Sequence, residues 1–418
     1  MRLTWSHKPY HRTHYTAMTR VAWFSRTKGD AYVVLVLLIC FLVNGVYSWS
    51  CPSDCICLSH TQILCNSGHL TYVPLNELPK TVEHLSLTKN NLTYLSIDAF
   101  NGLRSLRKLT LDGNSIHTIE QFAFRGLTRL RELTIQHTPL RALRKFSFSG
   151  LQNVTAILLG FNQISVIEEF AFATSANIRL ILLNNNPLHI VSAHAFSRLT
   201  NVEHLIMPSG IRQIQPDAFN GLDCVGLLKL SFMDLTSLKA HTFRGLSRVH
   251  VLAIQDSDLG VIRSEAFLGL THVGSLNILN NKIDSLQKLV VTRQNQVKHF
   301  RFNGNHVLDS PRKGMVDIVA LDGFSMMSNH FPCDCHLFRF LDKRPFGRNA
   351  STDWFSGKNF CISPLEFNGQ PISVVKQSVI DKCLESSSAV SYRYAISISY
   401  LVASFYNFLL LGYLNVKL

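Results

Sequence analysis

Aliphatic residues recur along the chain in one fixed spacing, which can be written L-x-x-L-x-L-x-x-N-x-L. The clearest copy begins at Leu106 and reads LRKLTLDGNSIHTIEQFAFRGLTR. Successive copies begin 24 residues apart, with a single step of 23, at Val82, Leu106, Leu130, Val154, Ile178, Val202, Val225, Val249, Val273, Val297 and Leu321. A period of this length indicates a solenoid in which each copy forms one turn.

The fourth and sixth residues of each copy are apolar and flank a variable residue, which is the alternation expected of a short strand. The clearest pairs are Leu85 and Leu87, Leu109 and Leu111, Leu133 and Ile135, Ile157 and Leu159, and Ile181 and Leu183. These side chains should point inward, and stacked copies should pair their strands into one parallel sheet. The predicted fold is an α/β repeat solenoid, with a curved parallel sheet on its concave side and irregular or 3-10 structure on its convex side.

Two other positions of the repeat carry one residue type. The ninth position is asparagine in seven copies, where its amide can satisfy backbone groups as the chain leaves the strand: Asn90, Asn114, Asn162, Asn186, Asn281, Asn305 and Asn329. The nineteenth position is phenylalanine in eight, which should stack as a spine under the convex side: Phe100, Phe124, Phe148, Phe172, Phe196, Phe219, Phe243 and Phe267. Gly210, Met233 and Ser257 replace the asparagine in the middle copies, where we expect a looser turn.

Cysteines flank the repeats on both sides. Cys51, Cys55, Cys57 and Cys65 precede the first copy, and Cys333, Cys335, Cys361 and Cys383 follow the last. A solenoid needs capping units because its ends expose the core. Even cysteine counts in a secreted chain indicate disulfides, and the spacing does not favour zinc. Four cysteines allow three pairings, so the sequence leaves the connectivity open.

The cysteine-rich flanks resemble the caps of extracellular leucine-rich-repeat proteins, and the second flank begins NHFPCDCHLFRFL. The resemblance covers about residues 51–383, and the combination of signal, caps, repeats and possible lipid anchor is similar to that of the Nogo receptor and connectin-like adhesion families. It implies the pairs Cys51–Cys57, Cys55–Cys65, Cys333–Cys361 and Cys335–Cys383. The chain departs from the families in its irregular middle repeats and its long leader.

Both ends of the chain carry targeting signals. Residues 31–46 read AYVVLVLLICFLVNGV after a basic stretch, which predicts a secretory signal; an uncleaved signal anchor is the alternative. Residues 395–414 are uncharged and follow Ser386, Ser387 and Ser388, which favours a glycolipid-anchor signal over a membrane span. The expected divisions are a leader (1–48), an N-terminal cap (49–81), repeats (82–332), a C-terminal cap (333–383), a linker (384–394) and the apolar tail (395–414).

Two cysteines lie outside the caps. Cys40 belongs to the expected signal and should be lost with it. Cys224 then has no partner, and we expect a buried, inert thiol, with an intermolecular disulfide as the alternative.

The net charge of +14 changes little in this interpretation. Six basic residues and one acidic residue precede residue 49, so loss of the leader alone lowers the charge to +9. The remainder is scattered and is not interleaved with aromatic residues, which argues against nucleic acid as a partner. The 18 histidines form no metal or catalytic motif, so no enzyme activity, metal or cofactor is predicted.

The outward positions of the strands change character along the repeats. The first three copies are polar there, whereas the fourth to seventh carry a candidate partner-binding set of Leu158, Phe161, Leu180, Leu182, Ile206, Leu227 and Phe232. An apolar patch among charged neighbours is typical of a protein interface. Lys298, His299 and Arg301 form a small basic group farther on, which we interpret as solvated charge, with binding of an acidic partner or a proteoglycan as the alternative. Asn91, Asn153 and Asn349 begin glycosylation sequons, which should mark surface that a partner leaves uncovered.

The sequence therefore predicts a cell-surface adhesion protein or receptor that binds a protein through its concave sheet. It would be attached to the outer face of the plasma membrane by its tail and would signal through a co-receptor. The alternatives are a secreted structural protein of the extracellular matrix and a pattern-recognition co-receptor that binds lipid or microbial products. Self-association to a homodimer is a further form of partner binding.

Overall fold

The computed structural model describes residues 50–384 except 288, 312–315, 320–321, 345 and 347–349. From Cys51 onward these residues belong to one compact unit. The expected leader, Cys40, Asn349, the anchor residues Ser386, Ser387 and Ser388 and the apolar tail lie outside the described residues. Within the described part of the chain, no helix combines the length and the apolar character that a bilayer crossing requires.

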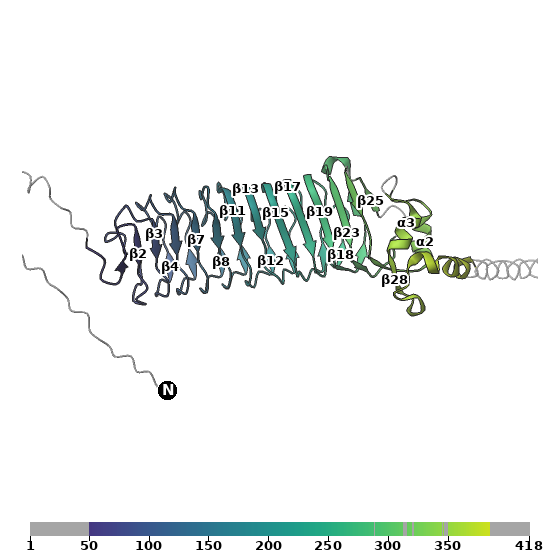
Figure 1. The fold of residues 1–418 in the computed structure, drawn as a ribbon, viewed down its shortest axis with the longest axis horizontal. Helices are drawn as coiled ribbons and strands as arrows, with labels where there is room; N and C mark the ends of the chain where they lie inside the picture. The colour runs from purple at the N-terminus through teal and green to yellow at the C-terminus, as the bar shows by residue number, and fades with distance from the viewer. Residues whose placement is uncertain are drawn as a thin grey trace, which may run out of the picture. The chain divides into compact units, whose positions relative to one another are not determined.

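One 13-stranded sheet runs through all the repeats and is the main feature of the fold (Figure 1). Its first two strands are antiparallel, and every later pairing is parallel. In order, the strands are β1 (Ile56–Cys57), β2 (Gln62–Leu64), β3 (His84–Ser86), β5 (Lys108–Thr110), β7 (Glu132–Thr134), β9 (Ala156–Leu158), β11 (Ala176–Leu182), β13 (Thr200–Ile206), β15 (Asp223–Ser231), β17 (Ser247–Gln255), β19 (Thr271–Leu279), β23 (His299–Asn303) and β26 (Gly323–Ser325). The parallel-sheet solenoid predicted from the repeat is confirmed.

Shorter strands form small sheets on the other parts of each turn. They are β4 (Tyr94–Leu95) with β6 (Thr118–Ile119); β8 (Ala142–Leu143), β10 (Val166–Ile167), β12 (Ile190–Val191) and β14 (Gln213–Ile214); β16 (Ser237–Leu238), β18 (Val261–Ile262) and β21 (Ser285–Leu286); β20 (Lys282–Ile283), β24 (His306–Val307), β27 (His330–Pro332) and β28 (Phe360–Ser363); and β22 (Leu289–Val291) with β25 (Val316–Ile318).

The described helices lie in the last part of the solenoid and in the C-terminal cap. They are η1 (Arg293–Asn295), α2 (Cys335–Leu341), α3 (Thr352–Lys358) and η2 (Leu365–Phe367), followed by helical residues 372–384.

The convex side of the described repeats is irregular, which is one of the two forms expected, and it uses turns and two-residue strands in place of 3-10 helices. The reason lies in backbone bonds between turns. Phe122 N donates to Phe146 O at 3.0 Å, and Phe146 N donates to Phe170 O at 3.2 Å. These residues adopt the left-handed conformation, so their N–H groups are satisfied by the next repeat and not within a 3-10 helix.

The core contains the two kinds of side chain that the repeat predicted. Residues at the fourth and sixth positions, such as Leu109 and Leu111, are completely buried. The eight phenylalanines of the nineteenth position are at most 2% exposed, and the centroids of successive rings lie 5.3 to 6.1 Å apart. Burying each ring contributes roughly 1.5–3 kcal/mol, so the spine is a large part of what holds the turns together.

A second stack of phenylalanines, which the sequence analysis did not anticipate, lies nearer the surface. Phe122, Phe146, Phe170 and His194 are half-buried, with ring centroids 5.6, 6.1 and 6.3 Å apart along the series. The ammonium group of Lys145 lies 5.6 Å from the Phe146 ring and 5.2 Å from the Phe170 ring. Phenylalanine is therefore abundant at two positions of the repeat, one in the buried spine and one in this outer stack.

The asparagines of the ninth position are buried and bond the backbone between turns. In the C-terminal repeats their amides also bond one another. Asn281 Nδ2 donates to Asn305 Oδ1 at 3.1 Å, and Asn305 Nδ2 donates to Asn329 Oδ1 at 3.1 Å. Asn329 Nδ2 donates in turn to Asn359 Oδ1 at 2.9 Å, so Asn359 extends this ladder into the C-terminal cap.

The looser turn expected in the middle repeats was a wrong prediction at Met233 and Ser257, which are buried. Ser257 Oγ accepts from Met233 N at 3.0 Å and donates to Gln255 O at 2.7 Å. A hydroxyl thus replaces the asparagine amide in this turn. Strands β15, β17 and β19, which surround it, have nine residues each and are the longest that the structure describes.

Disulfide-bonded caps close both ends of the sheet. The structure joins Cys51 to Cys57, Cys55 to Cys65, Cys333 to Cys361 and Cys335 to Cys383, the pairings that the family resemblance implied. In the C-terminal cap, the Asp334 carboxylate accepts from the backbone N–H groups of His336 and Leu337 at 2.9 Å and begins α2. The Phe355 ring packs against Phe331 and Phe346, at 5.5 and 4.9 Å between centroids.

Candidate partner-binding surface

The parallel register aligns equal positions of neighbouring repeats into rows across the outward face of the sheet. The fifth-position row reads Ser86, Thr110, Thr134, Leu158, Leu182, Ile206, Lys229, Ala253, Asn277, Arg301 and Ser325. Apolar side chains therefore occupy its middle, and polar or charged residues occupy most of its two ends.

Leu158, Leu182 and Ile206, which we call the apolar row, lie side by side as the sequence predicted. Leu182 is the register partner of Leu158 on β9 and of Ile206 on β13. Each of the three side chains is half-buried, so one surface of each remains in contact with solvent. At a strand spacing of about 4.8 Å, the row is about 10 Å long.

The third-position row beside it is only partly apolar. Leu180 pairs with Ala156 on one side and with His204 on the other, and His204 pairs with Leu227. The His204 Nε2 atom lies 3.4 Å from a carboxylate oxygen of Glu203. The structure thus places Leu180 beside the apolar row and separates Leu227 from Leu180 by a polar imidazole.

Phe161 and Phe232 are the most exposed members of the predicted set, at 47% and 62%. Both follow the ends of their strands in the left-handed conformation. They belong to repeats three strand steps apart, which is about 14 Å at the usual spacing. The Phe161 ring stacks on His137 at 5.0 Å. The structure therefore does not gather all seven residues into one patch, because a shared repeat position aligns side chains only in adjacent repeats.

Charged side chains surround the apolar row. Lys108 Nζ lies 2.8 Å from a Glu132 oxygen on the N-terminal side, and Arg179 Nε on β11 lies 3.3 Å from a Glu203 oxygen on β13. Lys229 follows Ile206 in the same row. Exposed ion pairs of this kind add little stability. An apolar centre with a charged rim is the usual anatomy of a protein interface.

Cys224 is half-buried and not fully buried, so the expected buried thiol is wrong. It occupies the residue before a repeat start, in the left-handed conformation, and its thiol lies 3.7 Å from Asn201 Oδ1. The periodic pattern could not predict this, because that position carries no single residue type.

Two of the three sequons fall on described residues, and both asparagines are exposed. The Asn91 Oδ1 atom accepts from Ser115 Oγ at 3.0 Å. The Asn153 Oδ1 atom accepts from Asn177 Nδ2 at 3.0 Å, at the edge where the strands of the sheet begin. Both asparagines lie outside the outward-facing rows.

Within the described residues, no three His, Cys, Asp or Glu side chains come together as a metal-binding group. The basic residues Lys298, His299 and Arg301 lie at the C-terminal end of the sheet. His299 and Arg301 face outward on β23, and Lys298 precedes that strand.

A family model describes the repeats directly. Residues 93–227 match the model of the BspA type Leucine rich repeat region, in six copies. This solenoid is built of leucine-rich repeats. With a disulfide-bonded cap at each end, the fold of the described residues is a capped leucine-rich-repeat solenoid.

Three solved structures similar to this leucine-rich-repeat chain share 17 to 20% sequence identity with it. The mouse RP105/MD-1 complex matches at 17% identity over 73% of this chain and 52% of that one, with a TM-score of 0.43. The TLR13–ssRNA13 complex matches at 20% identity over 69% and 47%, with a TM-score of 0.44. Human 5T4 (Wnt-activated inhibitory factor 1, trophoblast glycoprotein) matches at 19% identity over 78% and 96%, with a TM-score of 0.38. The match spans about half the length of the first two.

Proposed function

We propose that this protein is a cell-surface receptor or adhesion protein that binds a protein partner through the outward face of its 13-stranded sheet. The observation that carries the proposal is the apolar row, in which three aliphatic side chains on adjacent strands remain half-exposed among charged neighbours. When a partner removes the remaining surface of half-exposed aliphatic residues from water, the complex is stabilised by about 25 cal/mol per Å² of apolar surface.

The disulfide caps and the exposed sequons support an extracellular location, because disulfides persist in oxidising compartments. We infer that the apolar tail at 395–414 attaches the protein to the outer face of the membrane. Signalling would then depend on a co-receptor.

The test introduces charge into the apolar row. Leu182→Glu with Ile206→Glu should abolish binding of the cell-surface partner, because two carboxylates would have to lose their water inside the interface. The full chain is expressed on cells and screened against soluble ectodomains of cell-surface proteins and against cells expressing the same chain. Surface staining verifies that the variant is exported.

A matched control adds the same charges elsewhere. Val166 and Ile190 are register partners on β10 and β12 in one of the small sheets, and they are 41% and 40% exposed. Val166→Glu with Ile190→Glu should leave partner binding unchanged. Loss of binding in this control pair, with full binding by the row variant, would place the interface away from the 13-stranded sheet.

A further inference from the structure

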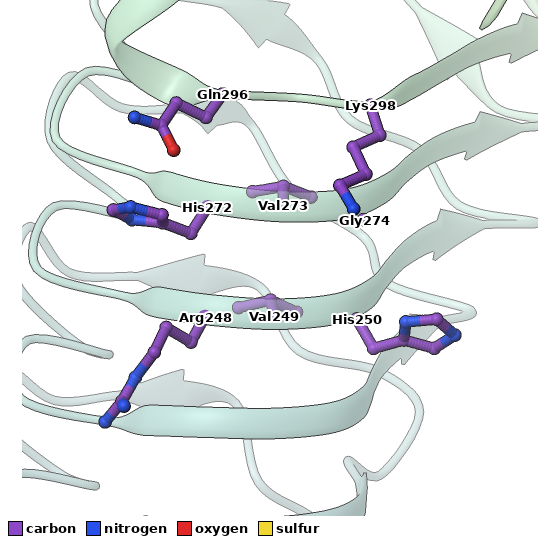
Figure 2. A pocket seen from close by; sticks show the side chains of 8 residues that line it. All are labelled: Arg248, Val249, His250, His272, Val273, Gly274, Gln296 and Lys298. Carbon is purple, nitrogen blue, oxygen red and sulfur yellow. The ribbon is translucent and has the colours of Figure 1, made fainter. Parts of the chain in front are cut away.

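A shallow pocket of about 340 Å³ opens over the starts of neighbouring strands in the C-terminal half of the sheet (Figure 2). Arg248, His272 and Gln296 lie along one side of it, and His250 and Lys298 lie along the other. All five are basic or amide side chains, and they come from four successive repeats.

The backbone accounts for the hollow. A Cβ atom on Gly274 would lie 2.5 Å from the carbonyl oxygen of His250, so only glycine fits at this position. Without a side chain there, the surface between His250 and Lys298 stays open, and the Lys298 side chain extends across the glycine (Figure 2). On the opposite side, Arg248, His272 and Gln296 each occupy the residue before a repeat start in the left-handed conformation, which aligns them in one row.

The pocket has an excess of positive charge. None of the described residues that line it is a carboxylate. Arg248 is already bound to Asp223, with Nε 2.8 Å from Oδ1, so part of its charge is satisfied. Among the described residues Lys298 takes part in no ion pair, and Asp322 on the next turn contacts it only through a backbone bond from Asp322 N to Lys298 O. The ammonium group of Lys298 is therefore the main cation available to a ligand.

The pocket and the apolar row lie on the same 13-stranded sheet. From Ile206 on β13 to Gly274 on β19 there are three strand steps, about 14 Å at the usual spacing. Leu227 and Lys229 lie on β15 between them. A standard interface of about 800 Å² per partner covers both regions.

We propose that this pocket binds a carboxylate-rich segment of the protein partner that covers the apolar row. This inference rests on the proposed function, and it specifies the partner as a protein with an apolar centre and an acidic flank. Ammonium, imidazole and amide groups donate hydrogen bonds to carboxylate oxygens, and bonds from a charged donor are the stronger ones. Complementary charge at one end of the interface also fixes the partner's orientation and speeds association.

The test measures binding of a fluorescein-labelled deca-glutamate peptide to the purified full-length chain in detergent at about 50 mM salt, where screening is weak. Lys298→Gln with His272→Gln should weaken binding by at least ~10-fold, a loss of about 1.4 kcal/mol. Lys298→Arg, which keeps the cation, should retain binding and shows that the site itself is intact. The matched control, Arg212→Gln with Arg263→Gln, removes two exposed cations outside the pocket and should have no effect.

Two results would overturn the proposal: peptide binding unchanged in the Lys298→Gln, His272→Gln variant, or binding of a heparin octasaccharide at the pocket without binding of the peptide. Leu182→Ser with Ile206→Ser separates this proposal from the proposed function. It should lose the cell-surface partner and still bind the peptide. If that variant keeps the partner while the pocket still binds the peptide, the proposed function fails and the anion site stands.

Discussion

Phenylalanines at two nearby positions of the repeat differ in burial, and they should differ in what they contribute to stability. Phe196 in the spine is fully buried, with neighbouring ring centroids at 6.1 and 5.8 Å. Phe170 in the outer stack is half-buried. We expect Phe196→Ala to lower the free energy of unfolding by about 3–5 kcal/mol. Phe170→Ala should cost about 1–2 kcal/mol, in proportion to the smaller area it buries. Guanidinium denaturation measures both, and equal losses would contradict the distinction between the two stacks.

A single carboxylate should give the protein a pH-dependent increment of stability. The hydrogen bond from the Arg248 guanidinium lowers the pKa of Asp223 from 3.8 to about 2, and this effect outweighs desolvation, which raises it. Because the pKa is lower in the folded state, the increment is present above about pH 4 and is lost as the pH falls from about 4 to about 2.

The Asp223 increment is small, at most about 1 kcal/mol, because the Arg248 side chain is 63% exposed and solvent screens the pair. Melting temperatures measured from pH 6 to pH 2 should fall less steeply below pH 4 in Asp223→Asn than in the natural chain. Arg248→Gln should flatten the profile in the same way. Identical slopes in all three chains would rule out this contribution.

At the scale of the element, the asparagine ladder adds side-chain hydrogen bonds between successive turns, beside those of the sheet. Asn305 Oδ1 accepts from Asn281 N at 2.9 Å, and Asn305 Nδ2 donates to Ile278 O at 2.9 Å. All of these groups are buried, so Asn305→Ala leaves several of them without a partner and should cost ~3 kcal/mol or more. Ser257→Ala, which removes a single hydroxyl from the equivalent position, should cost about 1 kcal/mol. Denaturant unfolding compares the two, and a similar loss in both would show that the amide has no special role.

The elements that repeat were predictable from the sequence, and those that occur once were not. Inward leucines and the Phe100 to Phe267 spine follow from alternation and period alone, because every turn faces the same packing problem. The repeat frame already places Phe161 and Phe232 three copies apart, so their separation along the sheet was predictable from the sequence and was overlooked. The pocket at Gly274 depends on one missing side chain in one repeat, so no periodic signal marks it.

At the scale of the whole molecule, the described chain is built on one 13-stranded sheet that is closed at both ends by disulfide-bonded caps. The sequence predicted this architecture because a stack of turns must cover its terminal cores. The outward-facing side chains do not pack in the core. Their composition varies along the sheet from ion-paired charge, through the apolar row, to the basic pocket. That variation supports a face adapted to one partner in one orientation.

The most direct measurement is hydrogen–deuterium exchange of the full chain, alone and with the partner that the cell-surface screen identifies. Partner binding should slow exchange in β9, β11 and β13, which carry the apolar row, and leave the small sheet of β8, β10, β12 and β14 unchanged. Protection confined to that small sheet, with no change in the three strands of the apolar row, would contradict binding through the outward face of the 13-stranded sheet.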